Sequence, residues 1–173
     1  MNSSQLEQRI REGIPIAAQM AFRVRSLTPS GITVVGGGEQ NHNVHGTAFA
    51  GSLYAIAALS AWGLVQSRLP KGAELVMARA EIDYRQPVIG DIVAHCNIDR
   101  ETFDSFLDDL HQKGRARLKA LSIVGSDGSV AAEFSGLLHA RLRQPAAGSW
   151  GRLISPALRY QQSNGSNVKL SGV

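Results

Sequence analysis

The chain is poor in cysteine, and we do not expect its first residues to form a signal peptide. Its 173 residues include one cysteine, Cys96, so no disulfide can form within the chain. A lone thiol is typical of proteins from a reducing compartment, and we expect a cytoplasmic protein. Residues 1–13 mix acidic and basic side chains and contain no apolar run, which argues against a signal peptide. The length suits one domain with a sizeable core.

The middle of the chain lacks charge. No Asp or Glu lies between Gln40 and Lys71, and the eighteen residues 48–65 carry no charge of either sign. A helix through this run has apolar or small side chains on every side, which predicts a helix about 27 Å long inside the core. A membrane span is the alternative. Two glycines and two serines dilute the hydrophobicity of the run, and we expect no membrane association.

Acidic residues are also missing from the end of the chain. Four basic residues and no acidic one follow residue 141, and they account for the whole net charge of +4. Residues 144–173 are rich in Ser, Gly, Asn and Gln and show no periodicity. They are therefore predicted to form a basic, flexible tail after a domain at residues 1–143. An acidic partner or nucleic acid for the tail is the alternative, but we expect no nucleic-acid binding.

A polar stretch leads into the uncharged run. Asn41, Asn43, His45 and Thr47 occupy alternate positions, and Gly46 allows close backbone approach before Thr47, the predicted N-cap. The amino end of a buried helix favours anions and developing negative charge. We therefore predict an oxyanion pocket from the backbone N–H groups of Gly46 and Thr47. The predicted catalytic residues are Asn41, His45, Gly46 and Thr47.

The flanking segments alternate between polar and apolar residues, as half-buried strands do. The pattern predicts strands at 21–27, 32–35, 73–85, 92–98, 115–124 and 129–142, and short helices at 4–13 and 101–113. Ser4 and Glu7 are predicted to form the capping box of the first helix. In the strand at 73–85 the even positions, from Val76 to Tyr84, are predicted to face inward. The expected fold is α+β, a single hotdog domain with an antiparallel sheet of five to six strands wrapped around a long buried central helix.

Two blocks of sequence resemble a known family. The first is Asn-x-Asn-x-His-Gly-Thr-x-Phe-x-Gly-Ser at 41–52, followed by Tyr54 and Trp62-Gly63; the second is Ile-Asp-Tyr-Arg-Gln-Pro-Val at 82–88. Over roughly residues 5–142 the chain resembles bacterial hotdog proteins of the YiiD C-terminal type. The resemblance implies a thioesterase acting on acyl thioesters of CoA or acyl carrier protein. It also implies a homodimer, or a tetramer, with sites at the subunit interface.

The resemblance leaves the reaction open. Some members similar to this chain decarboxylate malonyl-carrier protein, and their Asn and Thr in the first block correspond to Asn41 and Thr47. The chain departs from the family at Glu81 and Asp83, where the family tends to carry His and Arg. No cofactor is implied beyond the CoA or phosphopantetheine of the substrate.

Further side chains are expected to bind the substrate. Arg115 and Arg117 share one strand face with Lys119, where they could hold phosphate groups, although a solvated face is the alternative. No metal site is expected, because no Cys or acid lies at ligand spacing from His42 and His45. The predicted substrate-binding residues are Asn43, Phe49, Ser52, Tyr84, Arg115 and Arg117.

Three activities remain open from the sequence. Thioester hydrolysis, the favoured one, needs a base for the attacking water, and the candidates are His45, Glu39, Glu81 and Asp83. Malonyl decarboxylation needs only stabilisation of the enolate that forms when CO2 leaves, which suits a helix end without acidic neighbours. A non-catalytic acyl-CoA-binding module is the third possibility. Structural roles also remain open, with Thr47 only capping the helix and the asparagines only bonding the loop backbone.

Overall fold

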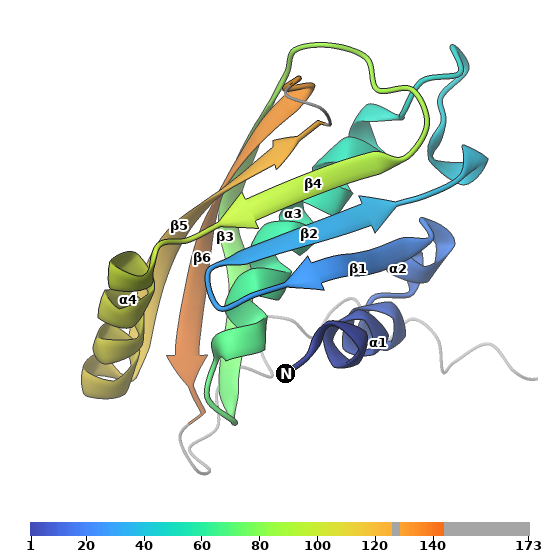
Figure 1. The fold of residues 1–173 in the computed structure, drawn as a ribbon. Coiled ribbons are helices and arrows are strands. Elements are labelled where there is room, and N and C mark those ends of the chain that lie inside the picture. The colour runs from blue at the N-terminus through green and yellow to red at the C-terminus, as the bar shows by residue number, and fades with distance from the viewer. Residues whose placement is uncertain (126–128, 144–173) are drawn as a thin grey trace, which may run out of the picture. The chain divides into compact units, whose positions relative to one another are not determined.

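The computed structural model describes residues 1–125 and 129–143, and here a curved antiparallel sheet holds a long helix in its concave face (Figure 1). The strands lie in the order β1-β2-β4-β5-β6-β3, so that β1 and β3 are the two edges. This confirms the predicted hotdog arrangement. The central helix is α3 (Ala50–Arg68), and the strands are β1 (Phe22–Leu27), β2 (Gly31–Gly36), β3 (Ala73–Tyr84), β4 (Ile92–Asn97), β5 (Arg115–Val124) and β6 (Ala132–Leu142).

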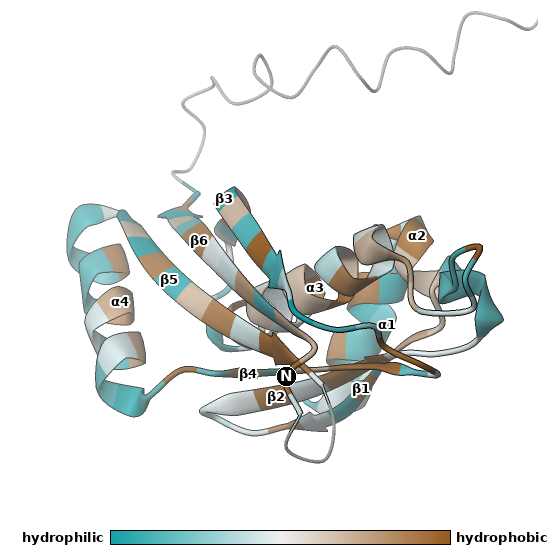
Figure 2. Cartoon of the chain, turned by 90° about the horizontal axis from the view of Figure 1, so that it is seen from above, coloured by the Kyte–Doolittle hydropathy of each residue, from teal (hydrophilic) through white to brown (hydrophobic). Residues whose placement is uncertain are grey.

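The central helix is buried because its uncharged sequence packs against the apolar face of the sheet. It contacts β2, β3, β4, β5 and β6, and Figure 2 shows it inside the curve of the sheet. Ile56, Ala57, Ala61, Leu64 and Val65 are fully buried along its length. No helix in the described part of the chain is long and apolar enough to span a membrane.

Two short helices precede the sheet, and the first of them packs against α3. α1 (Ser3–Gly13) buries Leu6 and Ile10 against it, and Gly63 of α3 leaves room for both side chains. α2 (Pro15–Gln19) follows directly. The predicted capping box is wrong, because Asn2 and Gln5 form it instead of the Ser4 pair. Glu7 accepts a hydrogen bond from the Val24 N–H at 2.8 Å and so ties α1 to β1.

In the second half of the domain, the helix and strands agree with the sequence prediction. α4 (Arg100–Lys113) begins after the N-cap Asp99 and ends at Gly114, which is left-handed. The predicted hairpin of β5 and β6 is present and fully antiparallel. Residues 126–128, where its turn was predicted, and the tail at 144–173 lie outside the described residues.

A bulge in β3 changes which residues face inward. Its pairing with β6 shifts between Met77 and Arg79, so the alternation changes phase there. Leu75 and Met77 face inward before the bulge, whereas Val76 is 46% exposed. The even-position prediction is therefore wrong for the first half of β3. It holds after the bulge, where Ala80 and Ile82 pack against the core and Tyr84, although half-exposed, donates a hydrogen bond to the Ala50 carbonyl of α3.

Leu64 tests how strongly burial of α3 stabilises the fold. It is fully buried in the core, so Leu64→Ala should lower the free energy of unfolding by about 2–5 kcal/mol. Urea unfolding should show a lower midpoint with an unchanged slope. Leu121→Ala, at a site 57% exposed, is the matched control and should change the free energy by less than about 0.5 kcal/mol. Equal losses in the two variants would contradict the assigned core.

Cys96 gives a pH-dependent test of the same core. Burial raises the pKa of this thiol to about 11, although a hydrogen bond with Ser122 partly offsets the shift. The protonated thiol therefore stabilises the folded state, fully below the unfolded pKa of about 8.5, and this contribution is lost as the pH rises through 11. Between pH 8 and pH 11, the free energy of unfolding should fall more for the native chain than for Cys96→Ala. Parallel pH profiles would contradict the prediction.

Candidate active site

The loop before α3 is organised by Asn43. Its side-chain Oδ1 accepts hydrogen bonds from the backbone N–H groups of His45 at 2.8 Å and Thr47 at 3.4 Å. Its Nδ2 donates to the Thr47 Oγ1 at 3.0 Å, and its own N–H donates to the Thr47 carbonyl at 2.8 Å. Gly46 completes the turn with φ +74°, a conformation that favours glycine, and donates to the Asn43 carbonyl at 3.1 Å. One asparagine thus fixes the whole turn.

These bonds change the expected roles of Gly46 and Thr47. Both N–H groups predicted as oxyanion donors are directed at Asn43 instead of an open pocket. The prediction that Thr47 caps the central helix is wrong, because α3 begins at Ala50, with Phe49 in the N-cap position and no side-chain cap. The helix begins later in the sequence than predicted because the Ala48 N–H donates a hydrogen bond to the Val88 carbonyl, which holds Ala48 outside the helix.

Three other amide groups are open at the start of α3. The first intrahelical hydrogen bond runs from the Leu53 N–H to the Phe49 carbonyl at 3.0 Å. Within the described residues the N–H groups of Ala50, Gly51 and Ser52 have no acceptor, as expected for the first turn of a helix. The Phe49 ring lies directly over Gly51, where any Cβ would collide with it. These three amides are oriented donors at the positive end of the helix dipole.

Aromatic side chains surround the same helix end. The Tyr84 hydroxyl donates a hydrogen bond to the Ala50 carbonyl at 2.9 Å, which fixes the end of β3 against the start of α3. Burial, and then the neighbouring Tyr54, raises the pKa of Tyr84, so its phenol stays protonated and able to donate. Tyr54 makes an edge-to-face contact with Phe134 at 5.4 Å. The exposed faces of Phe49, Tyr54 and Tyr84 provide an apolar surface beside the free amides.

Asn41 lies behind this surface. It is 1% exposed, at the end of the short helix η1 (Glu39–Asn41), and its Nδ2 donates to the carbonyls of Met20 and Gly37. Its backbone carbonyl accepts the Phe49 N–H at 2.7 Å. These bonds match the structural alternative for Asn41, and a catalytic role for it stays a prediction. Its Oδ1 and the Nε2 of His42 are buried and have no partner in the described structure.

The candidate bases are less well positioned. His45 is exposed on the loop, and no hydrogen bond holds its ring in the described structure. Glu39 is exposed, and Glu81 is 4.0 Å from Arg79 on β3. No carboxylate forms a hydrogen bond with the loop at 41–49 in the part of the chain that is described. The same residues contain no group of three or more potential metal ligands.

The predicted phosphate-binding arginines lie elsewhere. Arg115 and Arg117 are exposed on the outer face of β5. The starts of β5 and β3 lie at the same end of the sheet, on either side of β6, because the Leu142 N–H bonds to the Gly114 carbonyl and Leu142 also pairs with Ala73. Tyr84, which contacts the start of α3, is at the opposite end of β3. A single chain therefore does not bring these arginines to the loop, and their role stays a prediction.

The comparisons with known proteins agree with this fold. Residues 3–141 match the YiiD_C family, described as "Putative thioesterase (yiiD_Cterm)". The chain belongs to this family. It is a thioesterase-like hotdog protein.

Solved structures similar to this chain share the fold over nearly their whole length. A protein of unknown function from Chlorobaculum tepidum is 25% identical, with 82% of this chain and 94% of that chain covered and a TM-score of 0.75. A "Probable Thioesterase" from Pseudomonas aeruginosa is 21% identical, covering 83% and 97%, with a TM-score of 0.74. A "putative thioesterase" from Shewanella oneidensis is 28% identical, covering 82% and 97%, with a TM-score of 0.71.

Sequence reasoning missed the donors that the structure leaves open. Ala50 and Gly51 have no functional side chain, and the amides of a first helical turn are identified only once the helix start is known. Ser52 was predicted to bind substrate through its side chain, and the structure brings it beside those amides at 8% exposure. The available signal was Gly51, whose missing side chain leaves room for Phe49.

Asn43 should control the order of the loop. Asn43→Ala removes the acceptor for two amides, and a net hydrogen bond is worth about 1 kcal/mol, so the His45 and Thr47 amides should exchange roughly fivefold faster with deuterium. Val44→Ala, at a side chain 96% exposed, is the control and should leave exchange unchanged. Unchanged protection in the Asn43 variant would show that the turn holds without this side chain.

Proposed function

We propose that this protein hydrolyses acyl thioesters of CoA or acyl carrier protein, with the thioester carbonyl held at the amino end of α3. The observation that carries the proposal is the set of open amides of Ala50, Gly51 and Ser52. Attack by water puts negative charge on the carbonyl oxygen, and donors already oriented there stabilise that charge without reorganising. Family membership supports the reaction class.

The surrounding residues supply the other requirements of the reaction. Phe49, Tyr54 and Tyr84 offer an apolar surface for the acyl group. Removal of a proton from the attacking water is assigned to His45, which is exposed within the turn that Asn43 fixes. In this assignment Asn43 is a positioning residue, since its hydrogen bonds hold the backbone on both sides of Gly46.

Decarboxylation of a malonyl thioester is the second candidate. It is favoured by the neutral polar groups near the start of α3, where Asn43 and Thr47 of the loop and Tyr84 of β3 contribute amide and hydroxyl groups. Loss of CO2 leaves an enolate whose oxygen would occupy the same position as the hydrolytic oxyanion. A substrate carboxylate would also be attracted to the positive end of α3.

A mass-spectrometric assay distinguishes these reactions. Acyl- and malonyl-thioesters on CoA and on carrier protein are incubated with the protein, and the masses of the products are measured. Hydrolysis gives free thiol and free acid, decarboxylation gives the acetyl thioester, and neither product is expected from a non-catalytic binding module. Absence of free thiol above background from every acyl substrate would overturn the hydrolase proposal.

Ala50→Pro removes one of the proposed donors without disturbing the helix. Proline is favoured in the first helical position, and Phe49, at φ −66° and ψ 134°, has the extended conformation that a following proline requires. If the Ala50 amide binds the oxyanion, kcat should fall about 10²- to 10³-fold with little change in Tm. Ala50→Gly keeps the amide and is the matched control. An unchanged kcat in the proline variant would remove the Ala50 amide from the mechanism.

The protein is further proposed to be a homodimer paired through β3. This twelve-residue strand is an edge of the sheet, with one side of its backbone unpaired and with Val76 and Ala78 exposed. A long exposed edge favours pairing with another strand, and a two-fold axis pairs identical edges in antiparallel fashion. Light scattering should give about twice the chain mass of 18.5 kDa. A monomer at micromolar concentration would contradict this arrangement.

A further inference from the structure

The side of the sheet away from α3 carries charged side chains that the proposed reaction does not use. On β5 the even positions face α3, as the hydrogen bond between Ser122 and Ser60 at 2.7 Å shows, so the odd positions face away from the helix. The pairing of β5 with β6 and of β6 with β3 arranges the outward side chains in rows of three. We call these rows the outer patch, and from the start of β5 to its end they are Arg115-Arg141-Glu74, Arg117-His139-Val76, Lys119-Leu137-Arg79, Leu121-Ser135-Glu81 and Ile123-Glu133-Asp83.

The half of the outer patch nearest the start of β5 is basic. Its one carboxylate, Glu74, is 3.9 Å from Arg141 and so already has a partner. The register places Arg115 directly opposite Arg141, and like charges in that arrangement destabilise a sheet. Three exposed cations on β5 have no ion pair within the described residues, and we call them the basic end: Arg115, Arg117 and Lys119.

The opposite half of the outer patch is acidic. The last two rows hold three carboxylates and no cation, and we call these carboxylates the acidic end: Glu81, Asp83 and Glu133. The register places Asp83 directly opposite Glu133. Glu133 is paired with Arg85 at 2.6 Å and Glu81 is 4.0 Å from Arg79, whereas Asp83 has no ion pair in the part of the chain that the structure describes. The two ends of one surface therefore carry opposite charge.

Apolar side chains lie between the two charged ends. Val76 is 46% exposed and Leu121 is 57% exposed, and Leu137 between their strands is partly exposed. Exposed apolar side chains rimmed by polar residues mark contact surfaces between proteins. Three strands about 4.8 Å apart and about 33 Å long give the outer patch a footprint of about 480 Å². A standard interface covers about 800 Å² on each partner, so one patch alone would bind weakly, whereas the two patches of a β3-paired dimer together reach that size.

The charges of the outer patch match those of a second outer patch. Sheets that pack face to face keep their strands aligned to within about 30°. A two-fold axis that lies between the sheets and runs across the strands makes the stacked strands antiparallel, so each basic end faces an acidic end. The apolar side chains then meet in the middle. An acidic protein of another kind would match the basic end alone and would be repelled by the acidic end, so these observations favour a second copy.

We propose that two copies of this protein stack through their outer patches, with the basic end of each copy against the acidic end of the other. Together with pairing through β3, this contact joins two dimers into a tetramer. Exposed ion pairs are weak and are screened by salt, so stacking requires a higher protein concentration than β3 pairing and is lost at high ionic strength. The outer patch is on the opposite side of the sheet from α3, so the contact does not depend on the proposed reaction.

The mass of the assembly tests the contact. Light scattering of the whole chain is measured from micromolar to high micromolar concentration, at an ionic strength of about 0.01 M and again at about 1 M. At low salt the mass should rise twofold above that of the micromolar species, and high salt should reverse this rise. A mass that stays constant with concentration at low salt would overturn the proposal.

Charge reversal tests which ends meet. Arg117→Glu/Lys119→Glu reverses the net charge of the basic end, and Glu81→Lys/Asp83→Lys reverses that of the acidic end. Two copies of either variant face each other with like charges, so each variant alone should lose the twofold rise in mass. In an equimolar mixture every reversed end can face an end of opposite charge, and the rise should return in complexes that contain both variants. Retention of the rise by either variant alone, or no recovery on mixing, would overturn the assignment of the ends.

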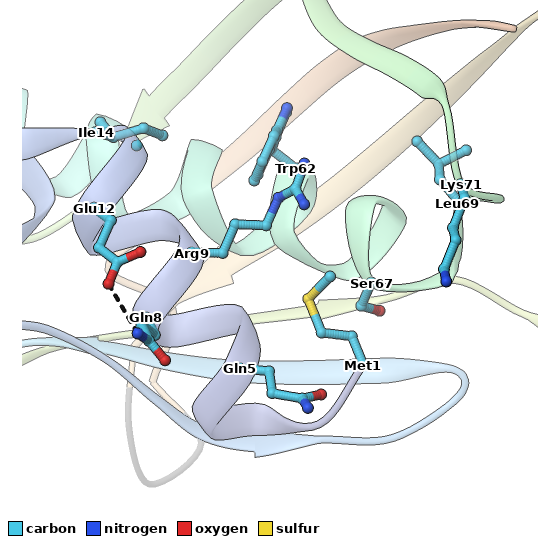
Figure 3. Close-up of a pocket in the computed structure, with 11 residues that line it drawn as sticks. Met1, Gln5, Gln8, Arg9, Glu12, Ile14, Trp62, Ser67, Leu69 and Lys71 are labelled. Atoms are coloured by element: carbon cyan, nitrogen blue, oxygen red, sulfur yellow. Dashed lines mark hydrogen bonds between the residues drawn. The ribbon is translucent and has the colours of Figure 1, made fainter.

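Arg9→Glu/Arg25→Glu is the matched control, because it changes the net charge by the same amount outside the outer patch. Both side chains are exposed and have no ion pair among the described residues. Figure 3 shows Arg9 extending from α1 toward Trp62 of α3, and Arg25 is on β1, at the opposite edge of the sheet from β3. This variant should keep the twofold rise. Its loss would show that net charge alone governs assembly and would overturn the proposal.

Discussion

Burial of an uncharged helix inside a single sheet is the constraint on which this structure depends. α3 carries no charge before Arg68, and the sheet and α1 bury most of its length. The most exposed part of the helix is its amino end, where Ala50, Gly51 and Tyr54 are exposed, whereas Ala55, Ala58 and Trp62 farther along are only partly exposed. At its amino end the first three amides have no intrahelical acceptor, and the side chains around them are aromatic or neutral. The requirement that stabilises the core therefore also produces the polar site.

The sequence predicts those elements of the fold whose residue pattern extends over many positions. Alternation identifies the six strands, and the uncharged run identifies the central helix, because both patterns extend over many residues. The bulge between Met77 and Arg79 could not be predicted, since it depends on the register that β6 imposes on β3. The helix start was also misplaced. A threonine before an apolar run is a good cap in isolation, but Asn43 bonds Thr47 into the loop and delays the helix to Ala50.

The candidate site shows the same limit more clearly. The motif at 41–52 leads into the start of α3, and the structure places Asn43, Phe49, Ser52 and Tyr84 around that helix end. The donors themselves are backbone groups, and their availability depends on which neighbouring amides the loop has already bonded. Arg115 and Arg117 were chosen by residue type and by the strand face that they share, and a pattern along one strand does not reveal where in the domain that strand face lies.

The most direct measurement is a structure of the protein with a CoA ketone analogue, in which a methylene group replaces the thioester sulfur. The account predicts that the ketone oxygen lies about 2.7–3.1 Å from at least one backbone nitrogen of Ala50, Gly51 or Ser52. A ketone oxygen held by other groups, with these three amides still without contact to the analogue, would contradict the central claim.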